Sequence, residues 1–223
     1  MRRSTPSSRH PSGSVGRGPD LSQPSGFRLL ADDDARSALE AWAGRFGTLA
    51  DAAAAQPGAR PLRGRGRVDV VPAPPGPWPA ETRWVVRRYR RGGALAAALG
   101  DRYPRLGTPR PFREYGVLVA LADAGIPAAR PVGAAVYPSG PFYRGDLVTD
   151  WVAGSLDLAR VLFDADQLDA FPSTPAGTAP ERAVAAMAAA GRLVRRLHDA
   201  GLDHPDLNLK NILVTEGAAG PAA

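Results

Sequence analysis

The stretch HPDLNLKNILV, residues 204–214, carries the strongest fold signal in this chain. It places a histidine, an aspartate and two asparagines directly before the apolar run Ile-Leu-Val. The carboxylate of Asp206 can orient a hydroxyl group and accept its proton, and the amide oxygen of Asn211 is a hard ligand that suits magnesium. The pattern therefore predicts a polar loop with a chemical role that leads into a short buried strand.

The spacing within this loop matches what phosphoryl transfer needs. That reaction requires a positioned acceptor hydroxyl and a metal ion that neutralises phosphate charge. In the catalytic loop of kinases the aspartate follows a histidine by two positions, and the asparagine follows the aspartate by five. His204, Asp206 and Asn211 have this spacing. We predict Asp206 as the catalytic base, Asn211 as a metal ligand and His204 as structural support; an ordinary polar loop is the alternative.

A kinase also needs a cation on a strand of the small lobe, paired with a glutamate on the helix that follows. The strand WVVRRYRR supplies Arg87, and the next predicted helix supplies Glu114. Lys210 is the only lysine of the chain, so an arginine must take the place of the usual lysine, with the charge kept and the compact ammonium geometry lost. We predict that Arg87 is the ligand of the nucleotide phosphates and that Glu114 pairs with it; an exposed strand cation and a surface helix residue are the alternatives.

Two further segments fit the same scheme. Gly64 and Gly66, in RGRGRV, are candidates for a glycine-rich phosphate cover, although a plain turn explains them equally well. The segment LVTDWVAG, residues 147–154, is expected to join two lobes. Its backbone would hydrogen-bond the adenine edge, and Gly154 would allow the bend.

The order of the predicted elements indicates an α+β fold, with strands and one helix followed by helices. Helices are expected over 32–55, 111–124, 156–170 and 180–200, and strands around 68–71 and 84–86 and within 126–154. In the last helix Val184, Met187, Val194, Leu197 and His198 share one face. The predicted fold is a protein-kinase-like two-lobe fold, with a small antiparallel-sheet lobe and an incomplete helical large lobe. Its expected divisions are a disordered basic tail (1–31), an N-terminal helix (32–55), the small lobe and hinge (56–154), and a partial large lobe ending just after the catalytic loop (155–223).

Composition excludes several classes of site. The chain has 223 residues, 44% of them hydrophobic, and no cysteine. Disulfides, thiolate metal sites and a cysteine nucleophile are therefore excluded. No apolar run is long enough to span a membrane, and the N-terminus lacks the apolar core of a secretory signal. The net charge of +6 favours phosphorylated ligands, anionic lipid or nucleic acid, or reflects only a basic surface.

Four segments together resemble the lipopolysaccharide core kinases, and most of all the branch of 3-deoxy-D-manno-octulosonic acid kinases. They are VVRRYRRGG, FREYGVLVALADAGIPAARPVGA, YRGDLVTDWVAGSLDLARVL and HPDLNLKNIL. The resemblance covers roughly residues 61–214. The Asp-Leu-Asn at 206–208 and the block RRYRRGG are its most distinctive parts.

This resemblance implies an ATP-dependent sugar kinase that uses ATP and Mg²⁺. Its acceptor would be a hydroxyl of a 3-deoxy-octulosonate residue on lipid A. The enzyme would be cytoplasmic, peripheral on the cytoplasmic face of the inner membrane. Asp206 would then be the catalytic base, Asn211 the metal ligand, and Arg87 and Glu114 the pair on the phosphate side. No nucleic-acid partner is expected, while the oligomeric state and the acceptor hydroxyl stay open.

One feature departs from the kinase pattern. Kinases of this fold carry a second metal-binding aspartate after the strand that follows the catalytic loop. Here that region reads TEGAAGPAA, residues 215–223, and Glu216 is its only carboxylate. We therefore expect a C-terminally incomplete kinase with weak nucleotide binding, slow or absent phosphate transfer, and exposed apolar surface on the large lobe.

Other functions share some of these features. An aminoglycoside- or choline-kinase-like phosphotransferase has the same loop, but it would favour an acidic acceptor pocket over an arginine-rich small lobe. A serine kinase acting on ribosome or tRNA-modification factors is another reading. An inactive pseudokinase or binding remnant is favoured by the missing metal ligand. A nucleic-acid-binding module is the least supported, because no aromatic residues are interleaved with the basic runs.

Overall fold

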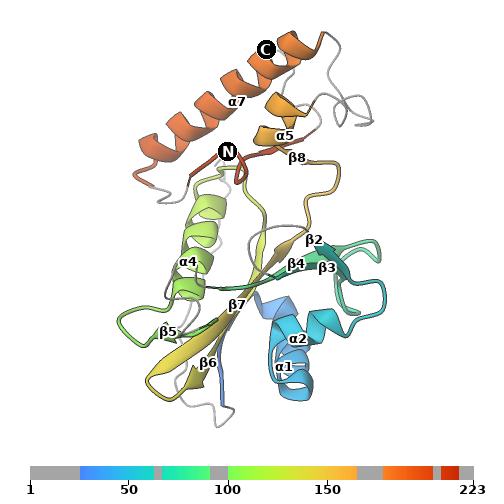
Figure 1. Ribbon diagram of the computed structural model, residues 1–223, viewed down its shortest axis with the longest axis vertical. Coiled ribbons are helices and arrows are strands. Elements are labelled where there is room, and N and C mark those ends of the chain that lie inside the picture. Colours follow the sequence, from blue (N-terminus) through green and yellow to red (C-terminus); the bar gives the residue numbers. More distant parts are fainter. Residues whose placement is uncertain (1–25, 63–66, 91–99, 165–177, 203–206, 216–223) are drawn as a thin grey trace, which may run out of the picture.

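The computed structural model describes residues 26–62, 67–90, 100–164, 178–202 and 207–215. Figure 1 shows a lobe built on a twisted antiparallel sheet and, beyond one end of that sheet, a smaller part dominated by one long helix. The α+β class predicted from the sequence is confirmed.

The first lobe contains a seven-stranded antiparallel sheet. The strands run in the order β1-β6-β7-β4-β3-β2, and β5 pairs with β7 outside this path. The bounds are β1 (Arg28–Ala31), β2 (Arg60–Leu62), β3 (Val68–Pro72), β4 (Arg83–Arg88), β5 (Tyr103–Pro104), β6 (Pro131–Ser139) and β7 (Phe142–Asp150). The predicted strands around 68–71, around 84–86 and within 126–154 are all confirmed.

Helices cover both faces of this sheet. Helices α1 (Asp33–Phe46) and α2 (Leu49–Ala54) pack on one face, and α4 (Arg110–Asp123) packs on the other. Strand β4 contributes to both layers by alternation: Trp84 and Val86 join the core under α1 and α2, while Tyr89, just after the strand, joins the core under α4. Neighbouring positions on this strand therefore reach opposite sides of the lobe.

The layer under α1 is close-packed around tryptophans. Trp84 is fully buried, and its ring lies 5.6 Å from that of Trp42 in an edge-on arrangement and 5.0 Å from that of Trp78. Helix α1 approaches β6 so closely that a Cβ added at Gly133 would lie 2.4 Å from a methyl carbon of Leu39. This glycine is therefore needed for the helix to seat on the sheet.

Two expectations for the N-terminal residues were wrong. Residues 28–31 do not belong to a disordered tail: they form β1, with Arg28 opposite Val136, because the leucines of this strand pack into the two cores. Residues 32–55 form two helices and not one. Gly47 ends the first with φ of +81°, and Thr48 caps the second by accepting a hydrogen bond from the Asp51 amide at 3.1 Å.

The second part of the structure is a small helical unit. It contains β8 (Leu156–Asp157), α5 (Leu158–Phe163), α7 (Ala179–Asp199) and β9 (Leu213–Val214), and β8 pairs with β9. The predicted helix over 156–170 begins at Leu158, and the rest of that range from 165 lies outside the described residues. None of the described helices combines the length and apolar character that a membrane span requires.

Helix α7 buries only part of the predicted face. Leu197 is buried as that pattern implies, but Val184 and Met187 are 69% and 47% exposed, and Ala186 and Ala190 are buried in their place. The alanines pack against α5 and Leu197 packs against the end of α4, because small side chains allow the helices to approach closely. Both stripes have helical spacing, so the periodicity could not choose between them. The exposed stripe agrees with the expected apolar surface on this part.

Candidate functional site

An ion pair joins β4 to α4 across the sheet. The Arg87 Nη2 donates a hydrogen bond to the Glu114 Oε2, so the structure brings the two predicted phosphate-side residues together. Their side chains are 42% and 31% exposed. Both charges are therefore held in a fixed pair and remain open to solvent on one side.

Two more side chains complete this site, and neither was singled out from the sequence. Tyr89 lies two residues after Arg87 on the same side of the sheet; its hydroxyl accepts from Arg87 Nη2 at 3.1 Å, and its ring lies 5.0 Å from that guanidinium. Arg110, at the start of α4, donates to Glu114 Oε1 at 3.3 Å and lies over the Tyr89 ring at 5.4 Å. Two guanidinium groups thus flank one carboxylate, which leaves a net positive charge for an anionic ligand.

Two groups of this cluster have pKa values shifted upward, Tyr89 and Arg87. Burial raises the pKa of Tyr89 far above its ordinary value of 10.0, so its hydroxyl stays protonated. Partial burial acts to lower the pKa of Arg87, but Tyr89 and Glu114 outweigh it and the net shift is upward. Arg87 therefore remains a cation.

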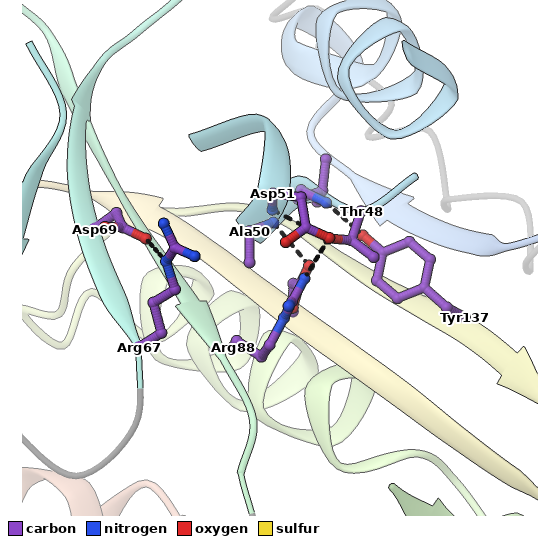
Figure 2. Close-up of polar contacts among 9 residues, drawn as sticks. Thr48, Ala50, Asp51, Arg67, Asp69, Arg88 and Tyr137 are labelled. Carbon is purple, nitrogen blue, oxygen red and sulfur yellow. Dashed lines mark hydrogen bonds and ion pairs between the residues drawn. The ribbon is translucent and has the colours of Figure 1, made fainter. Parts of the chain in front are cut away.

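A second polar cluster holds β4 from the opposite side of the sheet (Figure 2). Arg88 turns away from Arg87 toward α2. Its Nη2 donates to Asp51 Oδ2 at 3.0 Å and also to the Thr48 hydroxyl, and its Nε lies 3.5 Å from Asp146 Oδ1. The neighbouring arginines on β4 are thus both fixed, one by α4 and the other by α2.

Asp146 on β7 is the centre of this second cluster. It is fully buried, and its Oδ2 accepts from the Ala50 amide at 2.9 Å. Nearby, the Tyr137 hydroxyl accepts from the Leu49 amide at 2.8 Å. The free amides in the first turn of α2 are therefore satisfied by the sheet, which ties the N-terminal helices to the strand that carries Arg87.

The structure describes the loop HPDLNLKNILV from residue 207 onward. Asp206 and His204 lie outside the described residues, as do Gly64 and Gly66. Asn211 is exposed, and its amide donates to the Asn208 carbonyl at 2.9 Å in the turn before β9. The turn is anchored by the Leu158 amide, which donates to the Ile212 carbonyl at 2.9 Å. The C-terminal end of the loop is therefore held against the start of α5.

The described part of the chain holds no group of three or more His, Cys, Asp or Glu side chains placed to bind a metal ion. Asn211 is the metal ligand predicted from the sequence, and this role stays a prediction. An asparagine oxygen on an exposed, hydrogen-bonded turn fits one position in the shell of Mg²⁺, which keeps several waters and takes few protein ligands.

The predicted connection between the lobes follows β7. Residues 147–150 are the last four of that strand, and the chain then leaves the sheet. The Trp151 amide donates to the Arg83 carbonyl at 2.8 Å, and Gly154 has φ of +64°, which allows the chain to bend there. The expected hydrogen bonds from this segment to an adenine ring stay a prediction.

Some of the missed residues had a signal in the sequence. Tyr89 shares the period of two with Arg87, and Arg110 precedes Glu114 by four positions on a helix, so both were within reach of periodicity arguments. The partnership of Arg88 with Asp51 and Asp146 had none, because these residues lie 37 and 58 positions away.

Comparison with known proteins decides the family. Residues 78–222 match the model of the lipopolysaccharide kinase (Kdo/WaaP) family. The chain belongs to this family. The matched range contains the ion pair Arg87–Glu114 and the loop with Asp206 and Asn211, and the resemblance inferred from the sequence is confirmed. Strand β1 and helices α1 and α2 lie before the matched range.

Two relatives of this Kdo/WaaP family chain carry the same name. It is 32% identical over 138 residues to 3-deoxy-D-manno-octulosonic acid kinase of Vibrio cholerae serotype O1, covering 61% of this chain and 52% of the relative. It is 37% identical over 166 residues to the protein of that name from Xanthomonas oryzae pv. oryzae, covering 73% and 58%. The chain thus spans about half the length of these curated relatives.

A solved structure, WaaP in complex with acyl carrier protein, is similar to this chain at a TM-score of 0.47. The two are 20% identical, and the similarity covers 88% of this chain and 66% of that one.

Proposed function

We propose that this protein is an ATP-dependent sugar kinase that phosphorylates a hydroxyl of 3-deoxy-D-manno-octulosonic acid in the lipopolysaccharide core. Membership of the Kdo/WaaP family and the name shared by the relatives support this assignment. The α+β architecture, with an antiparallel small lobe, agrees with a protein-kinase-like fold.

The ion pair Arg87–Glu114 is the observation that carries the proposal. A cation on a central strand, held by a glutamate of the adjacent helix, is the arrangement with which kinases bind nucleotide phosphates. Here Arg110 adds a second guanidinium beside the same glutamate. The pair therefore offers ATP a preorganised cation, because Arg87 is held in one orientation by both Glu114 and Tyr89.

The remaining roles fall on the loop before β9. Asp206 would orient the acceptor hydroxyl and accept its proton, and Asn211 would contribute an oxygen ligand to Mg²⁺. The metal, when bound, neutralises charge on the transferred phosphate. We place the acceptor on a lipid A-linked sugar and the protein, as a peripheral enzyme, on the cytoplasmic face of the inner membrane.

The test is phosphate transfer by the whole chain. The protein is incubated with γ-labelled ATP, Mg²⁺ and a lipid A precursor that carries 3-deoxy-D-manno-octulosonic acid, and label in the lipid is measured. Asp206→Asn should reduce transfer by orders of magnitude and spare ATP binding. Asn211→Ala should raise the Mg²⁺ concentration needed for half-maximal transfer.

The outcomes separate the alternatives. If label appears on an aminoglycoside or on choline but not on the lipid-linked sugar, the acceptor is a small molecule and not the lipopolysaccharide core. Nucleotide binding without transfer to any acceptor would identify an inactive binding protein. Retained turnover in Asp206→Asn would remove that residue from the role of base.

A further inference from the structure

A short turn at the far end of the small lobe exposes a leucine. This β5 turn, residues 105–107, directly follows β5, which Figure 1 shows at the end of the lobe remote from α7. Leu106 is 82% exposed and is the most exposed large apolar side chain in the described part of the chain. An isolated exposed leucine needs no explanation by itself, but the surroundings of this one are unusual.

The backbone of the turn holds Leu106 outward. The Arg105 amide donates to the Pro141 carbonyl at 3.1 Å, which ties the turn to the connection between β6 and β7. The Leu106 amide donates to the Pro104 carbonyl at 2.9 Å, and Gly107 closes the turn with φ of +67°. Leu106 is thus presented on a hydrogen-bonded projection.

A cavity of about 160 Å³ lies beside this turn. It is lined by the cations Arg28 and Arg105 and by the largely apolar residues Val136, Pro138 and Tyr143. The hydroxyl of Tyr143 is already occupied, since it accepts a hydrogen bond from the Arg110 amide at 2.9 Å. The cavity therefore offers positive charge above an apolar lining.

The two guanidinium groups are available to a ligand. Over the ranges that the structure describes, neither Arg28 nor Arg105 lies in an ion pair. The Arg28 guanidinium makes a cation–π contact with the Phe112 ring, whose centroid lies 5.1 Å away. Both residues are exposed. Free arginines beside a projecting leucine combine the two terms that hold peripheral proteins on membranes: attraction to anionic head groups and insertion of an apolar side chain.

We propose that the β5 turn and its cavity form a docking surface for an anionic phospholipid bilayer. Lipid phosphates bind at Arg28 and Arg105, and Leu106 enters the boundary between head groups and acyl chains. A bilayer fits better than an acidic protein, because a projecting leucine suits a deformable surface, whereas a protein partner would have to supply a matching pocket. The inference rests on the proposed function in one respect, that the acceptor sugar is carried by a lipid.

The experiment measures binding of the whole chain to vesicles without ATP. Phosphatidylcholine vesicles with and without phosphatidylglycerol are sedimented at low and at moderate salt. Each arginine near an anionic surface contributes about fivefold to the partition coefficient, so Arg28→Glu with Arg105→Glu should lower it by at least about tenfold. Leu106→Ser should lower it several-fold without a change of charge. The matched control, Arg45→Glu with Arg60→Glu on α1 and β2, changes the net charge equally and should leave binding within about twofold.

Each outcome decides the proposal. It is overturned if the control pair weakens binding as much as the turn variants, or if neutral vesicles bind equally well. It is also overturned if deletion of residues 1–25 abolishes binding that the turn variants leave unchanged. The cavity would be reassigned to a soluble anion if millimolar inorganic phosphate displaces the protein from vesicles and Leu106→Ser binds vesicles as well as the parent protein does. All these side chains are exposed, so thermal melting of the variants should match the parent protein.

Phosphate transfer separates this inference from the proposed function. With a detergent-dispersed acceptor, the turn variants should keep their transfer rate. Loss of vesicle binding with transfer retained supports both proposals. Vesicle binding that persists in every turn variant removes the docking surface and leaves the kinase assignment untouched.

Discussion

Arg87 and Arg88 are neighbours on β4, yet they are held from opposite sides of the sheet. Arg87 pairs with Glu114 on α4, and Arg88 pairs with Asp51 on α2. The alternation of a strand produces this division. As a consequence, β4 cannot shift and displace Arg87, the candidate phosphate-binding residue, without also breaking the contacts of Arg88.

The first prediction concerns nucleotide affinity. Arg87→Met removes the cation and should weaken ATP binding by about tenfold or more, since hydrogen bonds to charged groups contribute about 1.5–3 kcal/mol. Arg87→Lys keeps the charge and should restore part of the affinity. Isothermal titration measures both, with the exposed Arg45→Met as the control. The melting temperature should change little, because half-exposed ion pairs contribute about 1 kcal/mol or less. Unchanged affinity in Arg87→Met would contradict the assignment.

The second prediction concerns Arg88. Its side chain is 15% exposed and that of Asp146 is 1% exposed, so Arg88→Met leaves a buried carboxylate without its cation. Such a loss costs about 3 kcal/mol. Urea denaturation should therefore show a marked fall in the free energy of unfolding. Arg60→Met, at an exposed position on β2, should stay within about 0.5 kcal/mol, and equal effects of the two substitutions would mean that the buried cluster is not stabilising.

The third prediction concerns pH. Burial raises the pKa of Asp146 above the ordinary 3.8 of an aspartate, although the Ala50 amide and Arg88 act to lower it. The folded protein then holds this proton more tightly than the unfolded chain does. The contribution of Asp146 to stability is therefore fully present below pH 3.8. It is lost as the pH rises through the raised pKa of the folded state.

A variant that cannot ionise tests this sign. Asp146→Asn should gain stability relative to the parent protein as the pH rises from about 3 to about 7. Urea denaturation at several pH values measures the difference in the free energy of unfolding between the two proteins. The pH dependence that comes from Asp51 is present in both and largely cancels. A difference that is constant would show that folding does not shift the pKa of Asp146, and one that moves against the variant with rising pH would show that the carboxylate is stabilised in its charged form.

The fourth prediction concerns the packing of α4 on the sheet. A Cβ added at Gly145 on β7 would lie 2.5 Å from Pro111 Cγ and 3.2 Å from the Ala135 carbonyl oxygen. Gly145→Ala should therefore cost about 1–3 kcal/mol and weaken ATP binding, because the displaced helix turn leads to Glu114. The opposite result is expected for Gly44→Ala, where no atom beyond the neighbouring residues and the backbone of the helix itself lies within 4 Å of the new Cβ. This helix position should gain about 0.5–1 kcal/mol, and thermal melting compares the two.

Periodicity and spacing predicted much of the fold. The strands β3, β4, β6 and β7 and the helices α4 and α7 were expected close to their observed bounds, because their apolar residues repeat with a clear period. Strand β1 was missed, since four residues are too few for a periodic signal and its stability comes from pairing with β6. The buried face of α7 was predicted only in part, with Leu197 buried but Val184 and Met187 exposed, because two apolar stripes compete on that helix.

The sequence alone determined the chemistry of the candidate site: the spacing of Asp206 and Asn211, the replacement of lysine by Arg87, and Glu114 on the following helix. Only the tertiary structure decided how Arg87 is held: Tyr89 and Glu114 contact it on one side of the sheet, Arg110 fixes Glu114, and Arg88 anchors the strand on the other side. The physical reason is distance along the chain. Local patterns record which face a residue takes, but partners that lie 37 or 58 positions apart meet only when the sheet and its helices have packed.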